Sequence, residues 1–147
     1  MLRFVLSILL SYLIGAINPA YLLGKLKGFD MRKRGSKNAG TFNTYETLGF
    51  LPAIFVFLID AGKAILCFWL AKEIFFLSEI KVYLSSLFAI IGHRFPFYLN
   101  FRGGKGVAAG IGLGLAAVFF QSTLENESYF ISFLIAVYVF VKYILKK

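Results

Sequence analysis

The sequence is poor in residues that bind metals, form disulfides or carry charge. Its 147 residues include one cysteine, Cys67, and one histidine, His93, and Asp and Glu together number only 7. Because zinc sites are built mainly from several thiolates and imidazoles, no such site is expected, and an internal disulfide is impossible. Charged residues make up 16% of the chain, against about 25% in soluble domains.

Apolar residues take the place of the missing charges. Hydrophobic residues account for 59% of the chain and aromatic residues for 18%, and the mean hydropathy is +0.78. A soluble domain of this size could not bury so much apolar surface, and disordered chains are poor in aromatic and aliphatic residues. The composition therefore excludes both classes and indicates a chain embedded in a bilayer.

Five apolar segments approach the length of about 20 residues that a helix needs to cross a bilayer. We therefore predict an all-α integral membrane protein with about five transmembrane helices, formed by residues 1–147 as a single domain. The first segment could be a signal peptide, but it continues past Asn18–Pro19 without a small-residue cleavage pattern, which favours a retained helix. The predicted spans are Phe4–Leu23, Leu51–Ala71, Val82–Phe101, Val107–Thr123 and Tyr129–Leu145.

Positive charge is concentrated in alternate loops. Lys and Arg number 16 against 7 acidic residues, a net charge of +9, and 12 of the 16 lie in the first and third loops and at the C-terminus. The positive-inside rule then places the N-terminus outside and the C-terminus in the cytoplasm. In a soluble protein this charge would suggest nucleic acid, but here it indicates membrane topology and anionic ligands, so no nucleic-acid partner is expected.

The two positive loops, Asp30–Asn43 and Gly92–Gly106, combine glycines with cations and small polar residues. Glycine-rich turns can direct several backbone N–H groups at one anion, and the second loop leads into an apolar helix whose N-terminus favours negative charge. The second loop lacks the Walker spacing, because Val107 follows Gly106. A phosphate site is favoured over simple attraction to anionic lipids, which would not need the small residues.

Three polar residues in or near the apolar spans leave their roles open. His93, at the end of the third span, is either a base at neutral pH or a satisfied interfacial residue. Asp60 and Lys63 share one helix face three residues apart, inside the second span. Charges at this depth are usually paired or functional, and we expect either a mutual structural pair or a direct functional role.

Together these features resemble the signatures of the bacterial PlsY family of membrane acyltransferases, over most of the chain. The segment Gly15–Gly28 is similar to the family's first helix, and Asp60 and Lys63 match an acidic-basic pair in its second helix. The two loops match the first two family motifs through Asp30, Arg32, Gly35, Ser36, Asn38, Gly40 and Asn43, then Gly92, His93, Phe95, Pro96, Phe101 and Gly103–Val107.

The resemblance implies an enzyme that transfers an acyl group from acyl phosphate to the sn-1 hydroxyl of glycerol 3-phosphate, giving lysophosphatidic acid for phospholipid synthesis. Its setting would be the bacterial cell membrane, among membrane lipids, with the glycine-rich loops at the cytoplasmic face and no metal or organic cofactor. The Ser36 loop would contribute to catalysis, and the Gly103–Gly106 loop would bind glycerol phosphate. We predict as catalytic Ser36, Asn38, Asn43 and His93, and as substrate-binding Lys37, Arg102, Gly103, Gly104, Lys105 and Gly106.

The sequence departs from the family pattern in ways that leave alternatives. Glu46 stands where the family has an arginine, Phe42 replaces a small hydroxyl residue, and Lys37 replaces a glycine and could compensate for the lost charge. The family typically has seven spans and a third motif with His, Glu and Asn, which this chain lacks. The alternative is therefore an inactive or truncated paralogue that binds phosphate or lipid without turnover, and a small transporter is a weaker one.

Overall fold

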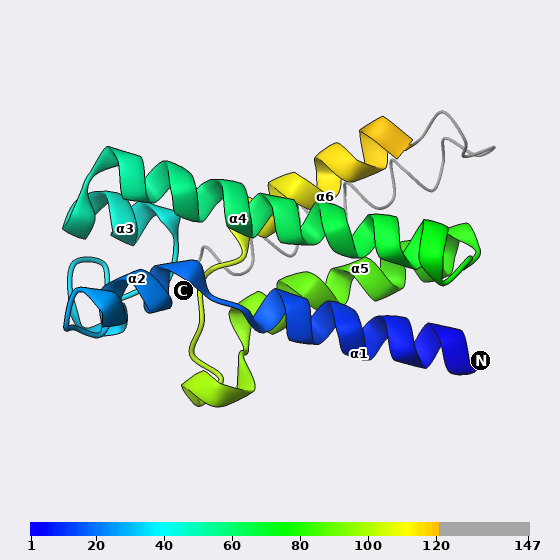
Figure 1. Ribbon diagram of the computed structural model, residues 1–147, viewed down its shortest axis with the longest axis horizontal. Helices are drawn as coiled ribbons and strands as arrows, with labels where there is room; N and C mark the ends of the chain where they lie inside the picture. The colour runs from blue at the N-terminus through cyan, green and yellow to red at the C-terminus, as the bar shows by residue number, and fades with distance from the viewer. Residues whose placement is uncertain (121–147) are drawn as a thin grey trace.

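The computed structural model describes residues 1–120, all of them in helices and the turns between them (Figure 1). The predicted fifth span, Tyr129–Leu145, lies outside the described residues, as does the end of the fourth. The α-helices are α1 (Leu2–Ala16), α2 (Pro19–Leu26), α3 (Thr41–Leu48), α4 (Phe50–Trp69), α5 (Glu79–Arg94) and α6 (Val107–Phe120). Two 3₁₀ turns, η1 (Met31–Lys33) and η3 (Phe97–Leu99), and the π-helical segment η2 (Leu70–Ile74) complete the described elements.

Two helical stretches in the described part of the chain are long and apolar enough to cross a membrane. They are Leu2–Leu26, which contains α1 and α2, and Phe50–Ile74, which contains α4 and η2; each has 25 residues. Helix α6 is a shorter apolar helix. The outward faces of these helices carry large exposed apolar side chains, among them Leu13, Leu58 and Val118, as expected where lipid replaces water.

The first predicted span is interrupted, and the third ends earlier than predicted. The first is interrupted at Ile17–Asn18, because Pro19 starts a new helix and the Asn18 side chain caps it by accepting from the Tyr21 N–H at 2.8 Å. The third ends at Arg94 and not at Phe101, because Pro96 follows at once and Asn100 and Phe101 take left-handed backbone angles.

Small residues let the long helices approach closely. A Cβ on Gly15 would collide with the backbone of Ala89, and a Cβ on Gly92 would collide with the carbonyl of Tyr12, so α1 and α5 pack backbone against backbone. A Cβ on Gly112 of α6 would likewise collide with the α4 backbone at Ala61. These close approaches form a bundle of α1, α4, α5 and α6 with α2 and α3 at one end (Figure 1).

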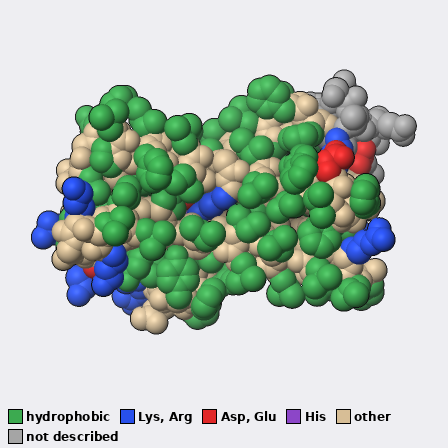
Figure 2. Space-filling model, viewed as in Figure 1, with side chains coloured by type: hydrophobic (Ala, Val, Ile, Leu, Met, Phe, Trp, Pro, Cys, Tyr) green, Lys and Arg blue, Asp and Glu red, His purple; other side chains and the backbone are tan. Residues whose placement is uncertain are grey.

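Charge is segregated along the bundle. Figure 2 shows the largest group of Lys and Arg side chains at the left end, where Figure 1 places α2 and α3, with a few more near the middle and at the right end, and hydrophobic side chains covering much of the visible length. The acidic side chains visible in this view lie mainly at the opposite end. The two positive loops of the sequence therefore meet at a single basic end of the bundle.

Candidate active site

The interruption of the first span exposes backbone groups that anchor the site. The Ala16 carbonyl accepts from the Tyr98 hydroxyl at 2.8 Å, and the Ile17 carbonyl accepts from Lys63 Nζ at 2.7 Å. The Asn18 amide donates to the Ala39 carbonyl at 3.0 Å. Both positive loops and Lys63 of α4 are thus hydrogen-bonded to the same break in the first span.

The Ser36 loop is held by Asn43, which is fully buried. The Asn43 amide donates to the carbonyls of Met31 at 2.8 Å and Asn38 at 2.7 Å, and its oxygen accepts from the Ser36 N–H at 2.9 Å. These bonds occupy the whole side chain. Asn43 therefore positions the backbone of the loop, and its catalytic assignment stays a prediction.

Glu46 lies beside the same loop. Its Oε2 accepts from the Ser36 N–H at 3.1 Å, so the carboxylate supports the backbone of the loop. No ion pair joins Glu46 to Lys37 within the described residues, so Lys37 does not compensate for the lost arginine through direct contact with Glu46. Lys37 instead adopts a left-handed backbone angle, φ 57°.

The glycine turn before α6 has fewer free backbone N–H groups for an anion than the sequence suggests. The N–H of Gly103 donates to the Arg94 carbonyl at 3.0 Å, and that of Gly104 donates to the His93 carbonyl at 3.1 Å. Both groups cap the C-terminus of α5, so neither N–H is free to bind a phosphate, and the substrate-binding role of the two glycines stays a prediction. The N–H groups of Lys105 and Gly106 have no acceptor among the described residues and remain available.

A buried cluster of ionisable side chains, Asp60, Lys63 and His93, lies beside this turn. Lys63 Nζ lies 2.7 Å from Asp60 Oδ1 and 2.9 Å from His93 Nδ1, and Nδ1 lies 3.1 Å from the same Asp60 oxygen. The three side chains are at most 5% exposed. The other edge of the His93 ring packs on Gly104, where a Cβ would collide with Nε2. The cluster therefore links α4 to the glycine turn, with the imidazole in contact with the turn itself.

A second set of polar contacts joins the two positive loops at the surface. Asp30 caps η1 and pairs with Arg32, Nη2 to Oδ2 at 2.8 Å, and Arg32 Nη1 donates to the Leu99 carbonyl at 2.8 Å. The hydrogen bond from Arg32 holds the pKa of Asp30 below its ordinary value, and the same bond raises the pKa of Arg32. The sequence motif contains both residues, but only their geometry shows that they fasten the loops together.

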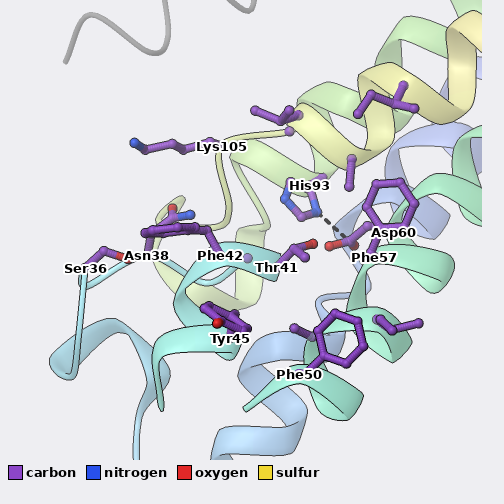
Figure 3. A pocket seen from close by; sticks show the side chains of 17 residues that line it. Ser36, Asn38, Thr41, Phe42, Tyr45, Phe50, Phe57, Asp60, His93 and Lys105 are labelled. Carbon is purple, nitrogen blue, oxygen red and sulfur yellow. Dashed lines mark ion pairs between the residues drawn. The ribbon is translucent and has the colours of Figure 1, made fainter. Parts of the chain in front are cut away.

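A cavity of about 820 Å³ opens between α3, α4 and the start of α6 (Figure 3). Ser36, Asn38 and Lys105 lie on its polar side, and Asp60 and His93 lie on its inner wall. The sequence does not single out the apolar residues that line it, since aromatic residues in a membrane protein carry no distinctive signal. That lining includes Phe42, Tyr45, Phe50, Ile54, Phe57, Val107 and Ile111.

The predicted substrate-binding residues divide between two cavities. Lys105 and Gly106 line the larger one, whereas Lys37, Arg102 and Gly103 line a separate cavity of about 510 Å³. Within residues 1–120, no group of three or more His, Cys, Asp and Glu side chains could hold a metal ion. The larger cavity thus joins an apolar chamber to a cationic polar rim, as an amphiphile with an anionic head requires.

Comparisons with known proteins agree with this architecture. The sequence profile of the glycerol-3-phosphate acyltransferase family matches residues 5–146. The chain is 39% identical over 142 residues to glycerol-3-phosphate acyltransferase 2 of Moorella thermoacetica, and 43% identical over 119 residues to glycerol-3-phosphate acyltransferase of Synechococcus sp. (strain CC9902). The matches cover 95% and 79% of this chain, which spans 69% and 59% of the two relatives' lengths.

Two solved structures share the fold. The crystal structure of the integral membrane glycerol 3-phosphate acyltransferase PlsY in its glycerol 3-phosphate form has a TM-score of 0.73 and 28% sequence identity. The match covers 94% of this chain and 74% of that one. The lysophosphatidic acid form has a TM-score of 0.75 at 22% identity, covering 96% and 87%. The prediction of an all-α integral membrane protein is confirmed.

Proposed function

The chain belongs to the PlsY-type glycerol-3-phosphate acyltransferase family, and on this premise we propose that it transfers an acyl group from acyl phosphate to the sn-1 hydroxyl of glycerol 3-phosphate. The product would be lysophosphatidic acid, a precursor of membrane phospholipid. The relatives and structures that match carry acyltransferase names and give no support to the alternative of binding without turnover.

The observation that carries the proposal is the two-part character of the larger cavity. Its aromatic and aliphatic lining suits an acyl chain, and its rim brings Ser36, Asn38 and Lys105 together (Figure 3). The available N–H groups of Lys105 and Gly106 lie at the N-terminus of α6, where partial positive charge favours an anion. The reacting carbonyl would lie where the two parts meet.

The reaction needs positioning and fixed positive charge more than a strong base. The sn-1 oxygen forms the ester bond to the carbonyl carbon, and the bond from that carbon to the phosphate oxygen breaks. Phosphate leaves with the electron pair and carries off the hydroxyl proton. Lys105 would hold phosphate, while Ser36 and Asn38 would orient the reacting groups. His93 would act as a positioning residue, because its Nδ1 is engaged by Asp60 and Lys63.

The setting of the reaction follows from the charge segregation. We infer a multi-pass domain, residues 1–147, in a bacterial cell membrane, with the basic end in the cytoplasm and the N-terminus outside. Glycerol 3-phosphate would reach the Ser36 side of the cavity from the cytoplasm, and acyl phosphate would enter from the lipid. The gathering of Lys and Arg at one end supports this orientation (Figure 2). The C-terminal side of this assignment lies outside the described residues.

The test is acyl transfer by the purified full-length protein, with acyl phosphate and glycerol 3-phosphate as substrates and lysophosphatidic acid as the measured product. Lys105→Ala should weaken glycerol 3-phosphate use by about 1.5–3 kcal/mol, a roughly tenfold to hundredfold rise in KM, because a charge-assisted hydrogen bond is lost. Lys27→Ala, an exposed lysine outside both cavities, is the matched control. Glycerol 3-phosphate binding with no product from the wild type would instead establish the inactive paralogue.

A further inference from the structure

The smaller cavity is a separate site from the proposed acyl-transfer cavity. We call it the basic cavity; its volume is about 510 Å³, and it shares no lining residue with the larger one. Its wall is formed by η1, the Ser36 loop and the turn after η3. The lining residues are Asp30, Arg32, Lys33, Lys37, Asn100, Arg102 and Gly103.

The floor of the basic cavity is built by Arg32. Its guanidinium pairs with Asp30 through two nitrogens, at 3.0 and 2.8 Å, and reaches the other loop at the carbonyls of Leu99 and Arg102, at 2.8 and 3.4 Å. Arg32 also lies over the ring of Tyr21, 5.1 Å from its centroid. Its charge is neutralised by Asp30, and its position is held by four groups: the Asp30 carboxylate, two backbone carbonyls and the Tyr21 ring. Arg32 therefore shapes the cavity without being its anion-binding group.

Three other cations line this cavity, and none of them forms an ion pair with a carboxylate of the described residues. No ion pair or side-chain hydrogen bond joins Lys33, Lys37 or Arg102 to another described residue. Asp30, the only acidic residue of the lining, is occupied by Arg32. Three like charges at one cavity repel one another, and an anion bound among them removes that repulsion.

The backbone at Lys37 is strained. Lys37 has φ 57°, an angle that a lysine rarely adopts and a glycine adopts readily. At this strained position a lysine places a cation at the wall of the basic cavity, whereas a glycine would leave the wall uncharged. Strain of this kind is often retained at sites that bind ligands.

Exposed aromatic residues border the basic cavity on the side of η3. Phe97, Tyr98 and Phe101 are 55%, 44% and 60% exposed, and Phe101 lies between two lining residues, Asn100 and Arg102. Aromatic side chains are enriched at the level of lipid headgroups, where a ring contacts acyl chains and a polar edge contacts water. These exposed aromatic residues therefore indicate a position at the level of the lipid headgroups for the adjoining basic cavity.

We propose that the basic cavity binds the phosphate of an anionic membrane phospholipid, with the acyl chains of this lipid lying along the exposed aromatic residues. Basic pockets beside membrane helices at the cytoplasmic side bind anionic headgroups by the same combination of charge and depth. The bound lipid is not a substrate, because the cavity is separate from Ser36 and Lys105. The proposal stands whether or not the chain transfers acyl groups.

The test measures the lipid retained by the full-length protein after purification in detergent with an equal mixture of phosphatidylglycerol and phosphatidylcholine, counted by native mass spectrometry. The wild type should retain phosphatidylglycerol preferentially. Lys37→Gly and Arg102→Gln should each lower that preference about fivefold, since each removes one cation near the surface. Lys27→Gln, which removes an exposed lysine outside the cavity, should leave the preference unchanged.

Lys37→Gly also protects the test against misfolding, because glycine accepts the left-handed backbone angle of this position. Equal retention of the two lipids by the wild type, or equal preference in the wild type and both variants, would overturn the proposal. Displacement of phosphatidylglycerol by an equal concentration of inorganic phosphate would assign the cavity to free phosphate and would also overturn it. Neither glycerol 3-phosphate nor acyl phosphate is present, so the outcome is independent of the proposed activity.

Discussion

Neutralising Asp60 alone should destabilise the protein far more than neutralising Asp60 and Lys63 together. In Asp60→Asn, the ammonium of Lys63 stays buried after losing a carboxylate 2.7 Å away. Its remaining neighbours, the Ile17 carbonyl at 2.7 Å and His93 Nδ1 at 2.9 Å, carry no negative charge. The Lys63 side chain is only 5% exposed and does not line the larger cavity, so water can replace the lost partner only in part.

The magnitudes follow from this burial. Removing one partner of a buried ion pair costs about 3–5 kcal/mol, because the other charge is left uncompensated. The double variant Asp60→Asn/Lys63→Met removes both charges and leaves mainly the Ile17 carbonyl without its donor, at about 1–3 kcal/mol. The cost of the double variant should therefore be smaller than that of either single variant, and far below their sum.

The assay is unfolding of the purified protein in mixed micelles, for the wild type, both single variants and the double variant. The matched control is Asp30→Asn, which breaks an ion pair of similar length, 2.8 Å, whose side chains are 17% and 23% exposed. Because water reaches this pair, its loss should cost only about 0–1 kcal/mol. A strictly additive double variant would refute the reasoning, since it would show that the two charges do not compensate each other.

Three further predictions concern single positions. Gly112→Ala should destabilise the α4–α6 contact, because the added Cβ would collide with the α4 backbone. Gly62→Ala should be neutral or mildly stabilising in the same unfolding assay, because a Cβ added there would meet no neighbouring atom within 4 Å. The pKa of Asp30 is lowered below its ordinary value of 3.8, so the stability difference between wild type and Asp30→Asn should be constant above that pH and vanish as pH falls below it. Glu46→Gln should raise glycerol 3-phosphate affinity, because the carboxylate that accepts from the Ser36 N–H adds negative charge beside the proposed phosphate site; an unchanged KM would show that this charge does not reach the substrate.

The sequence by itself determined the class of this protein and the position of its basic loops. Composition alone indicates a helical membrane protein, because burial in lipid requires long apolar segments with internally bonded backbones. The segregation of Lys and Arg into alternate loops indicates a basic end, and both glycine-rich loops meet there. These conclusions depend on properties of contiguous segments, so no knowledge of tertiary contacts is needed. The family resemblance was confirmed for the same reason, since it rests on motifs within single loops.

Only the tertiary structure decided which residues act together. Lys37 and Lys105 both belong to basic, glycine-rich loops, yet they line different cavities, because side-chain direction depends on backbone angles such as φ 57° at Lys37. The N–H of Gly104 looks available in the sequence but caps α5 in the fold. Asp60 and His93 are far apart along the chain, and their contact exists only because α4 and α5 pack side by side. Pairing across helices is a property of packing, and the local sequence does not specify it.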